Sequence, residues 1–305
     1  MKKMLIVDTR LIAYLAYHRK ESIFKTFHYI TSYADFYGEY DKIIYAFDSP
    51  KGSKKRKELY SEYKAHRRAR EQEQTSLEKE RKKQFNKDYI HLYELFKFLG
   101  NPILIDGLEA DDIANIIVDK FKDKYQIYLL SSDSDWAMNL LNDNIKQIHL
   151  VKGLITKGTC FQHYGKEVED ITFIQSLCGI AKENVKGVYK FGEGRCKSLL
   201  YKEGHNQTEV INIVQGWVDA GKYGCKLPDN YSSVIDLYNF NYELLRPFTL
   251  GDLTKEELDS FKSQFNISSC GNGDVIEELD NKAIELFGKP LMLDMEDINF
   301  YFNIM

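Results

Sequence analysis

The sequence predicts an α/β protein with a doubly wound, mainly parallel sheet and a second part that is mainly helical. In the first half, short segments rich in β-branched and aromatic residues alternate with longer amphipathic segments. Such an alternation is typical of parallel strands joined by crossover helices. After about residue 161 the pattern changes to short helices separated by glycine-containing turns. We therefore expect a sheet region at 1–160 and a helical region at 161–305.

The elements of the sheet region follow from hydrophobic periodicity and length. A weaker strand is expected around Ile145–Val151. Helices are expected from Leu11 to about Tyr37, with Gly38 as a stop, and over about Ala69–Leu99 and Ala110–Phe121. The predicted buried strands, too short for helices, are Met4–Val7, Lys42–Phe47, Pro102–Ile105 and Gln126–Leu130.

Targeting and redox signals are weak in this chain. The start MKKMLIV resembles a signal peptide, but Asp8 and Arg10 interrupt the apolar run, so a strand and a helix are expected instead. No apolar run reaches the roughly 18 residues of a membrane span. The five cysteines are scattered without a CxxC pair. This spacing argues against zinc or a disulfide framework and favours a reducing cytoplasm.

The net charge of −4 conceals a strong asymmetry along the chain. Residues 51–83 carry 13 Lys and Arg against 6 Glu, whereas residues 226–305 carry 6 Lys and Arg against 15 Asp and Glu. A basic stripe on an acidic protein is typical of a binding surface for a polyanion. On charge alone, a solvated helix face with internal salt bridges remains an alternative.

Acidic residues follow each of the four strand segments. In an open parallel sheet the carboxyl ends of all strands lie at one edge, where ligands bind. Taken singly, such an acid can be a turn residue, an N-cap or a partner of a helix dipole. Four strands that all lead into acids are better explained by one shared site. The acids are Asp8, Asp48, Glu109, Asp111, Asp112, Asp133 and Asp135.

Seven carboxylates in one pocket repel one another, which raises their pKa values and destabilises the fold. Hard divalent cations such as Mg²⁺ or Mn²⁺ compensate this charge, because oxygen ligands suit them. The sequence therefore predicts a divalent-metal site at the edge of the sheet.

The motifs IVD, AFD, GLEADD and SSDSDW, which carry these acids, resemble those of the 5′-nuclease or flap endonuclease family. The resemblance covers roughly Met4 to Leu200 and is strongest to bacteriophage members and to the N-terminal nuclease domain of bacterial DNA polymerase I. It implies a PIN-like sheet, a helical arch at about 51–87 and a helix-three-turn-helix DNA-binding element at about 171–203. It also implies metal-dependent removal of 5′ flaps and RNA primers during DNA replication, with 5′-3′ exonuclease action.

Roles for individual residues follow from the same resemblance. The seven acids match metal ligands, and two ions are expected. In the run YSEYKAHR, Lys64 and Arg67 match cations that contact the scissile phosphate, and Tyr14 matches an aromatic residue that stacks on a base. Two surface charges and ordinary core packing are the respective alternatives. The basic arch, which includes Lys54, Lys55, Arg56 and Arg68, would collect the single-stranded 5′ end.

The segment Cys178–Leu200 resembles the turn with which the family grips duplex DNA. Ile180 stands where the family has an acid, Glu183 replaces the Asp of another metal ligand, and Lys190 replaces a glycine. A second ion is therefore expected to bind weakly, through Glu183. The residues expected to contact DNA here are Asn184, Lys186, Gly187, Lys190, Gly192, Arg195 and Lys197.

The expected function is that of a 5′ nuclease that acts as a monomer on branched DNA or RNA–DNA hybrids, together with replisome proteins. Two other functions are alternatives to it. The loss of an acid at Ile180 favours a structure-specific DNA-binding protein with weakened catalysis. A PIN-like fold also occurs in RNA-directed nucleases, although the duplex-gripping segment argues against that function. The region after about Lys202 matches no motif.

Overall fold

The computed structural model describes the chain except residues 68–72, 266–273, 292, 294 and 303–305. It divides into two compact units, which are described separately. Unit 1 contains residues 1–53, 75–159 and 248–305, and unit 2 contains residues 54–74 and 160–247. No helix in the described part of the chain is long and apolar enough to cross a membrane.

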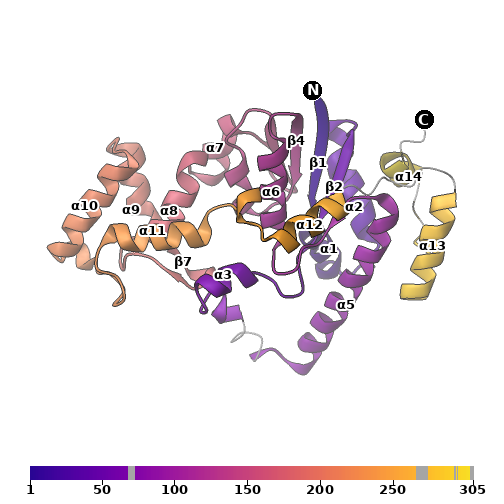
Figure 1. Cartoon of the computed structure of the whole chain (residues 1–305), viewed down its shortest axis with the longest axis horizontal. Coiled ribbons are helices and arrows are strands. Elements are labelled where there is room, and N and C mark those ends of the chain that lie inside the picture. The colour runs from indigo at the N-terminus through magenta and orange to yellow at the C-terminus, as the bar shows by residue number, and fades with distance from the viewer. Residues whose placement is uncertain (68–72, 266–273, 292, 294, 303–305) are drawn as a thin grey trace. The chain divides into compact units, whose positions relative to one another are not determined.

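Unit 1 is built on a six-stranded sheet in the order β3-β2-β1-β4-β5-β6. Figure 1 labels its central strands β2, β1 and β4. All neighbouring strands are parallel except the last pair, β5 and β6. The predicted doubly wound, mainly parallel sheet is therefore confirmed. The strands are β1 (Lys2–Asp8), β2 (Lys42–Ala46), β3 (Pro102–Ile103), β4 (Tyr125–Leu130), β5 (Ile145–His149) and β6 (Gly153–Ile155).

Helices lie on both faces of this sheet. On one face, α1, α2, α5 and α13 pack around buried aromatic residues such as Phe27, Phe47 and Phe96. On the other face, α6 contacts β1, β2 and β4. The helices of unit 1 are α1 (Thr9–His18), α2 (Lys25–Ala34), α5 (Ser76–Leu99), α6 (Ala110–Phe121), α12 (Lys255–Phe265), α13 (Asp274–Phe287) and α14 (Met295–Phe302), with shorter turns η1 (Asp35–Tyr37), η2 (Ser134–Asn139), η3 (Lys157–Thr159) and η8 (Leu250–Asp252).

The prediction of one helix from Leu11 to about Tyr37 is wrong, because the chain breaks after His18. Lys20 adopts a left-handed backbone with φ of 59°. The N–H groups of Lys20 and Glu21 then donate to the carbonyls of Tyr17 and Ala16 and close the first helix. Residues 19–22 are polar but include neither glycine nor proline, so no strong helix-breaking signal marks the break in the sequence.

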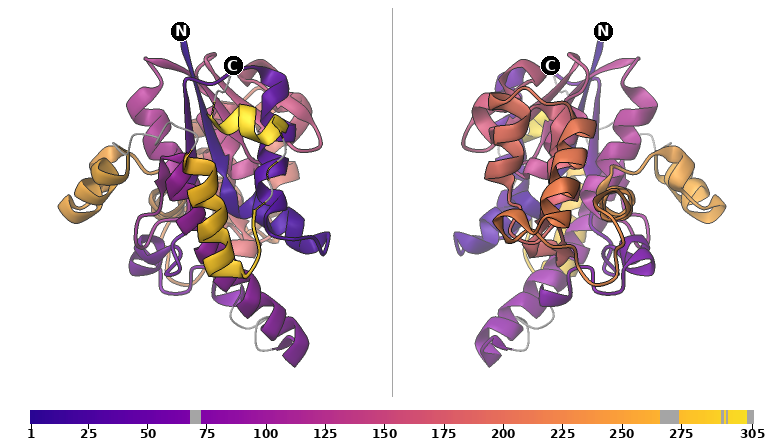
Figure 2. Two further views of the ribbon diagram at one scale, coloured as in Figure 1. Left: turned by 90° about the vertical axis from the view of Figure 1, so that its right-hand side faces the viewer. Right: turned by 90° about the vertical axis from the view of Figure 1, so that its left-hand side faces the viewer.

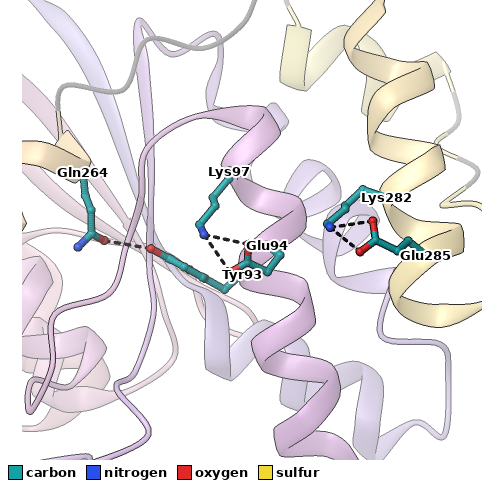
Figure 3. A network of polar contacts seen from close by, with 6 residues as sticks. All are labelled: Tyr93, Glu94, Lys97, Gln264, Lys282 and Glu285. Atoms are coloured by element: carbon teal, nitrogen blue, oxygen red, sulfur yellow. Dashed lines mark hydrogen bonds and ion pairs between the residues drawn. The ribbon is translucent and has the colours of Figure 1, made fainter.

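The C-terminal region belongs with the sheet and not with the helical unit. Figure 3 shows Tyr93 of α5 donating its hydroxyl hydrogen bond to Gln264 of α12 at 3.3 Å. Gln264 also accepts from the Leu104 N–H, and α13 packs beside α5 (Figures 1 and 2). The structure thus places residues 248–305 outside the region 161–305 in which the sequence grouped them, because their packing partners are distant in the chain.

Unit 2 is mainly helical, and two cores hold it together. The larger core includes Phe173, Leu177 and Phe191, and the smaller one contains Tyr63, Val185 and Leu244. A two-stranded ladder pairs β7 with β8. The elements are α3 (Lys54–Leu59), α7 (Cys160–Tyr164), η4 (Val168–Asp170), α8 (Ile171–Cys178), β7 (Gly179–Ile180), η5 (Ala181–Glu183), β8 (Val185–Lys186), α9 (Glu193–Lys197), η6 (Ser198–Lys202), α10 (Gln207–Asp219), η7 (Lys222–Gly224) and α11 (Val234–Leu245).

Candidate metal centre and nucleic-acid-binding element

The predicted acids of unit 1 lie at the carboxyl ends of its strands. Asp8 is the last residue of β1, Asp48 follows β2, and Asp133 and Asp135 lie where β4 leads into η2. The strands β2, β1 and β4 are adjacent in the sheet. The chain forms β2 and β3 on one side of β1 and then crosses over to form β4 on the other side. This is the position at which open α/β sheets bind ligands.

Three acids cluster at the start of α6. One carboxylate oxygen each from Glu109, Asp111 and Asp112 lies within 4.8 Å of the others. Asp112 is fully buried, and one of its oxygens accepts a hydrogen bond from the Glu109 N–H at 3.0 Å. Asp112 therefore caps the helix as well as adding charge to the cluster, while Glu109 and Asp111 are half-buried at its edge.

Asp8 is a strongly perturbed acid of the site. Burial, together with the charge of Asp48, raises the pKa of Asp8 to about 7. Its two oxygens accept hydrogen bonds from the Leu11 N–H at 3.0 Å and the Ser131 hydroxyl at 2.8 Å. These donors hold the carboxylate in place without neutralising it. The edge of the sheet therefore concentrates negative charge that a bound cation would relieve.

Asp48 is held by residues that the sequence did not single out. One oxygen accepts from the Ala110 N–H at 2.7 Å, and the other lies 3.4 Å from the Arg10 guanidinium. The Asp48 N–H donates to the hydroxyl of Tyr89 on α5. The carbonyl of Asp133, in the loop after β4, accepts a hydrogen bond from the buried side-chain amide of Gln147 on β5. Arg10 lies two residues after Asp8 in the sequence. This position next to an acid motif could have indicated Arg10 as a partner of the acids.

The acids fit divalent metal ions because they offer several carboxylate oxygens, and burial together with the charge of Asp48 raises the pKa of one of them, Asp8. Since folding raises the pKa of Asp8, the folded protein binds more protons than the unfolded chain between about pH 4 and 7. The free energy of unfolding of the metal-free protein should therefore fall as pH rises through that range. Metal ions require deprotonated ligands, so their binding should strengthen in the same direction.

We expect Mg²⁺ or Mn²⁺ to raise the melting temperature, and to raise it more at pH 8 than at pH 5.5. Thermal melts with and without the ion measure this difference. In Asp8→Asn the metal-free protein should be more stable at pH 8, and the metal-induced rise should be smaller. An equal rise at both pH values, unchanged in the variant, would contradict a metal centre at Asp8.

In unit 2, the predicted cations Lys64 and Arg67 both contact Glu183. The Lys64 ammonium lies 3.3 Å from one carboxylate oxygen, and the Arg67 guanidinium lies 3.1 Å from the other. The Glu183 side chain is 5% exposed and that of Lys64 is 12% exposed, whereas that of Arg67 is 55% exposed. The Lys64 N–H also donates to the Glu183 carbonyl. Glu183 therefore fixes the two cations relative to the turn that carries it.

The residues at 180 and 183 each have partners within unit 2. Ile180 packs against the apolar core formed by Tyr63, Val185 and Leu244. Lys64 and Arg67 already balance the charge of Glu183. The expected ligation of a weak second ion by Glu183 therefore has no support in this geometry.

Ile180→Asp should consequently destabilise the protein, by about 1–3 kcal/mol for an unpaired polar group placed in an apolar contact. It should leave the metal concentration for half-maximal activity unchanged. Thermal melts and metal titrations of Ile180→Asp beside Ile180→Val test both statements. A well-folded Asp variant that needs less metal would show that this position limits a second ion.

Two glycines hold the β7–β8 turn together. A Cβ on Gly179 would lie 2.3 Å from the Gly187 nitrogen, and one on Gly187 would lie 2.0 Å from the Cys178 carbonyl carbon. Lys190, which replaces a glycine of the family pattern, has φ of 57° and so keeps the conformation that glycine favours. The Asn184 side chain donates to the Glu62 carbonyl at 2.9 Å. Close backbone packing at the two glycines and the Asn184 hydrogen bond therefore fix the conformation of this turn.

The remaining predicted residues differ in their surroundings. Arg56 is buried and donates to the Leu244 carbonyl at 3.1 Å, so it serves the core of unit 2 and offers no exposed contact for DNA. Lys54 pairs with Glu58 at 3.7 Å, and Lys197 pairs with Glu193 at 2.6 Å. Lys55, Lys186, Gly192 and Arg195 are exposed or half-exposed. Arg68 lies outside the described residues.

Tyr14 on α1 is 43% exposed and lies among aromatic rings. Its ring centroid is 5.3 Å from that of Phe85 and 4.4 Å from that of His18, both edge-to-face. The side chain therefore combines packing on α5 with an exposed face. Base stacking by Tyr14 stays a prediction.

Comparisons with known proteins agree with this architecture. Residues 3–168 match a family model described as the 5′-3′ exonuclease, N-terminal resolvase-like domain. The chain is 29% identical over 167 residues to a 5′-3′ exonuclease of Mycoplasmopsis pulmonis (52% of this chain, 50% of that protein). It is 27% identical over 170 residues to the flap endonuclease of Escherichia phage T5 (55% and 57%). These matches span about half the length of the curated relatives.

The solved structures extend the likeness in fold. The T5 5′-exonuclease with bound zinc ions superposes with a TM-score of 0.65 at 22% identity, over 94% of this chain and 99% of that one. At this identity the likeness shows the fold. Because the family model covers more than half of the chain and includes all seven acids of the sheet edge, the chain belongs to the 5′-3′ exonuclease N-terminal, resolvase-like domain family.

Proposed function

We propose that this protein is a structure-specific 5′ nuclease that hydrolyses phosphodiester bonds in branched DNA, as a flap endonuclease and a 5′-3′ exonuclease. The observation that carries the proposal is the group of acids at the strand ends of unit 1, within a chain of the 5′-3′ exonuclease family. Relatives named 5′-3′ exonuclease and flap endonuclease support the reaction class.

In this proposal the acids of unit 1 hold Mg²⁺ or Mn²⁺. Divalent ions bound there would activate water and stabilise the leaving oxygen of a phosphodiester. Asp8 and Asp48, held by backbone N–H groups, Ser131 and Arg10, are positioned as ligands before any ion binds. Glu109, Asp111, Asp133 and Asp135 supply further oxygens, and Asp112 supports them from the buried helix cap.

Lys64 and Arg67 are the cations that we propose to act on the scissile phosphate, where they would stabilise charge that develops in the transition state. Their shared partner Glu183 is proposed as a positioning residue instead of a metal ligand. The proposed DNA contacts are Lys54, Lys55, Asn184, Lys186, Gly187, Lys190, Gly192, Arg195 and Lys197, and Tyr14 is proposed to stack on a base beside the cut.

A 5′-labelled flap duplex incubated with Mg²⁺ or Mn²⁺, beside a single-stranded RNA, tests the proposal. We expect cleavage at the branch. Binding without cleavage would favour the DNA-binding protein with weakened catalysis, which the apolar setting of Ile180 motivates. Degradation of the RNA alone would favour an RNA-directed nuclease.

The proposed setting is a reducing cytoplasm of a bacterial or phage-infected cell, because all four cysteines in the described part of the chain are free thiols. Action as a monomer, use of RNA–DNA hybrids and contact with replisome proteins remain proposals that follow from the family's role in DNA replication.

A further inference from the structure

In unit 2, a loop at residues 222–226 lies against the duplex-gripping turn. The Tyr189 N–H donates to the Lys226 carbonyl at 2.8 Å and forms an antiparallel bridge. The Lys190 side chain lies beside Gly224, where an added Cβ would be 3.1 Å from its Cδ. Together they border a groove of about 780 Å³, called the basic groove below, whose lining includes Lys186, Lys190, Tyr189, Lys226 and Asp229.

Within the described part of the chain, several cations around this groove form no ion pair with a carboxylate. Lys222 and Lys226 are exposed, and neither forms an ion pair with any residue that the structure describes. Lys186, Lys190 and Arg195 in the segment Cys178–Leu200 are likewise exposed, and they form no ion pair with a described residue. Close by in the sequence, Lys197 is instead paired with Glu193. Clustered cations that the protein does not neutralise attract a polyanion.

An aromatic support fixes the loop. The Arg195 guanidinium lies 4.7 Å from the ring centroid of Tyr223, and the Lys222 ammonium lies 5.1 Å from it. Trp217 packs edge-on against the same ring at 4.9 Å and also contacts the buried Phe191. Tyr223 has φ of 57°, a conformation that costs a non-glycine residue about 1–3 kcal/mol. The contacts of its ring with Trp217 and the two cations therefore hold a strained loop in one arrangement.

We propose that Lys222 and Lys226 bind phosphates of duplex DNA, with Tyr223 as their positioning residue, and that this loop lengthens the duplex-binding surface of the turn. The inference rests on the proposed function, because it assigns a part of the substrate to the basic groove. Single-strand-binding surfaces offer open aromatic faces for bases. Here Arg195 and Lys222 lie against the ring of Tyr223. The ring therefore holds cations that can contact phosphates, and it is not an open face on which a base could stack.

The test measures binding in EDTA, so that no DNA is cut. Wild type and Lys222→Ala/Lys226→Ala are titrated with 5′-flap substrates that have a short or a long duplex arm, and with a single strand. We expect the double variant to lose affinity for the long arm, and the slope of log K against log salt to shrink by about 1.8, since each phosphate contact contributes about 0.9. Affinity for the single strand should not change.

Two further variants control for fold and for general charge. Lys202→Ala removes an exposed lysine that does not line the groove and should change none of these affinities. Tyr223→Gly keeps a left-handed backbone without strain but removes the ring, and it should lower long-arm affinity in a protein that melts normally.

Equal loss for single strand and duplex, or no loss in the double variant, would overturn the inference. Failure of the proposed function is a separate result. It would appear as a wild type that cuts no flap substrate with Mg²⁺ or Mn²⁺, while the difference in binding between wild type and variant still stands.

Discussion

Asp135→Asn should abolish cleavage of a 5′-flap substrate while leaving binding of the branched DNA largely intact. Asp135 lies in η2, after the carboxyl end of the central strand β4, where Asp133 accepts a hydrogen bond from its N–H at 3.0 Å. The change removes the negative charge of a proposed metal ligand with little change in side-chain size. Metal occupancy should fall, whereas the affinity for DNA should come mainly from phosphate contacts elsewhere. Single-turnover cleavage and equilibrium binding measure the two effects.

Asp143→Asn is the matched control. Asp143 is exposed between η2 and β5, so its loss changes net charge equally without touching the acid cluster. This control should cut at the wild-type rate. An Asp135→Asn protein that cuts as fast as wild type in Mg²⁺ would show that the sheet edge is not the active centre.

Arg67→Ala should lower single-turnover cleavage by about 10²–10³-fold, the loss typical of one electrostatic contact that acts in the transition state. Binding should weaken much less. The side chain is half-exposed, so its removal disturbs packing little. Arg81→Ala, which removes an exposed arginine of the basic stripe on α5, is the control for charge. If Arg67→Ala and Arg81→Ala weaken binding alike and both cleave normally at saturating DNA, then Arg67 is only a tether.

Lys64 needs a different design because it is buried against Glu183. Lys64→Ala leaves that buried carboxylate with Arg67 as its remaining charged contact among those described, and breaking a buried ion pair costs about 3–5 kcal/mol. The double variant Lys64→Ala/Glu183→Gln removes both charges. It should recover most of the melting temperature but not the cleavage rate. Recovery of the rate together with the stability would indicate that Lys64 has only a structural role.

The acid cluster at the edge of the sheet was largely visible in the sequence. Strand segments are short and β-branched, and an alternating βα pattern allows a parallel sheet whose strand ends share one edge. Asp8, Asp48 and the acids after β3 and β4 therefore had to converge. The hydrophobic pattern of the strands, together with the rule that parallel strands end at one edge of a sheet, was sufficient to predict that these acids lie together.

The sequence did not show which residues contact which acids, although the position of Arg10 beside Asp8 marked it as a candidate. Arg10 reaches Asp48, and Ser131 reaches Asp8 from β4, through contacts that depend on how neighbouring strands and helices are placed. The raised pKa of Asp8 likewise comes from burial and from the nearby Asp48 charge, neither of which a linear sequence displays.

By itself, the sequence determined the fold class, the acid cluster and the family, because hydrophobic periodicity and short motifs encode them locally. Tertiary structure decided what Glu183 does, since its contact with Lys64 joins residues far apart in the chain. It also decided that α12 and α13 belong to the same unit as the sheet and that the loop at 222–226 borders the turn. These features depend on long-range packing and on charges brought together by folding, which no local pattern records.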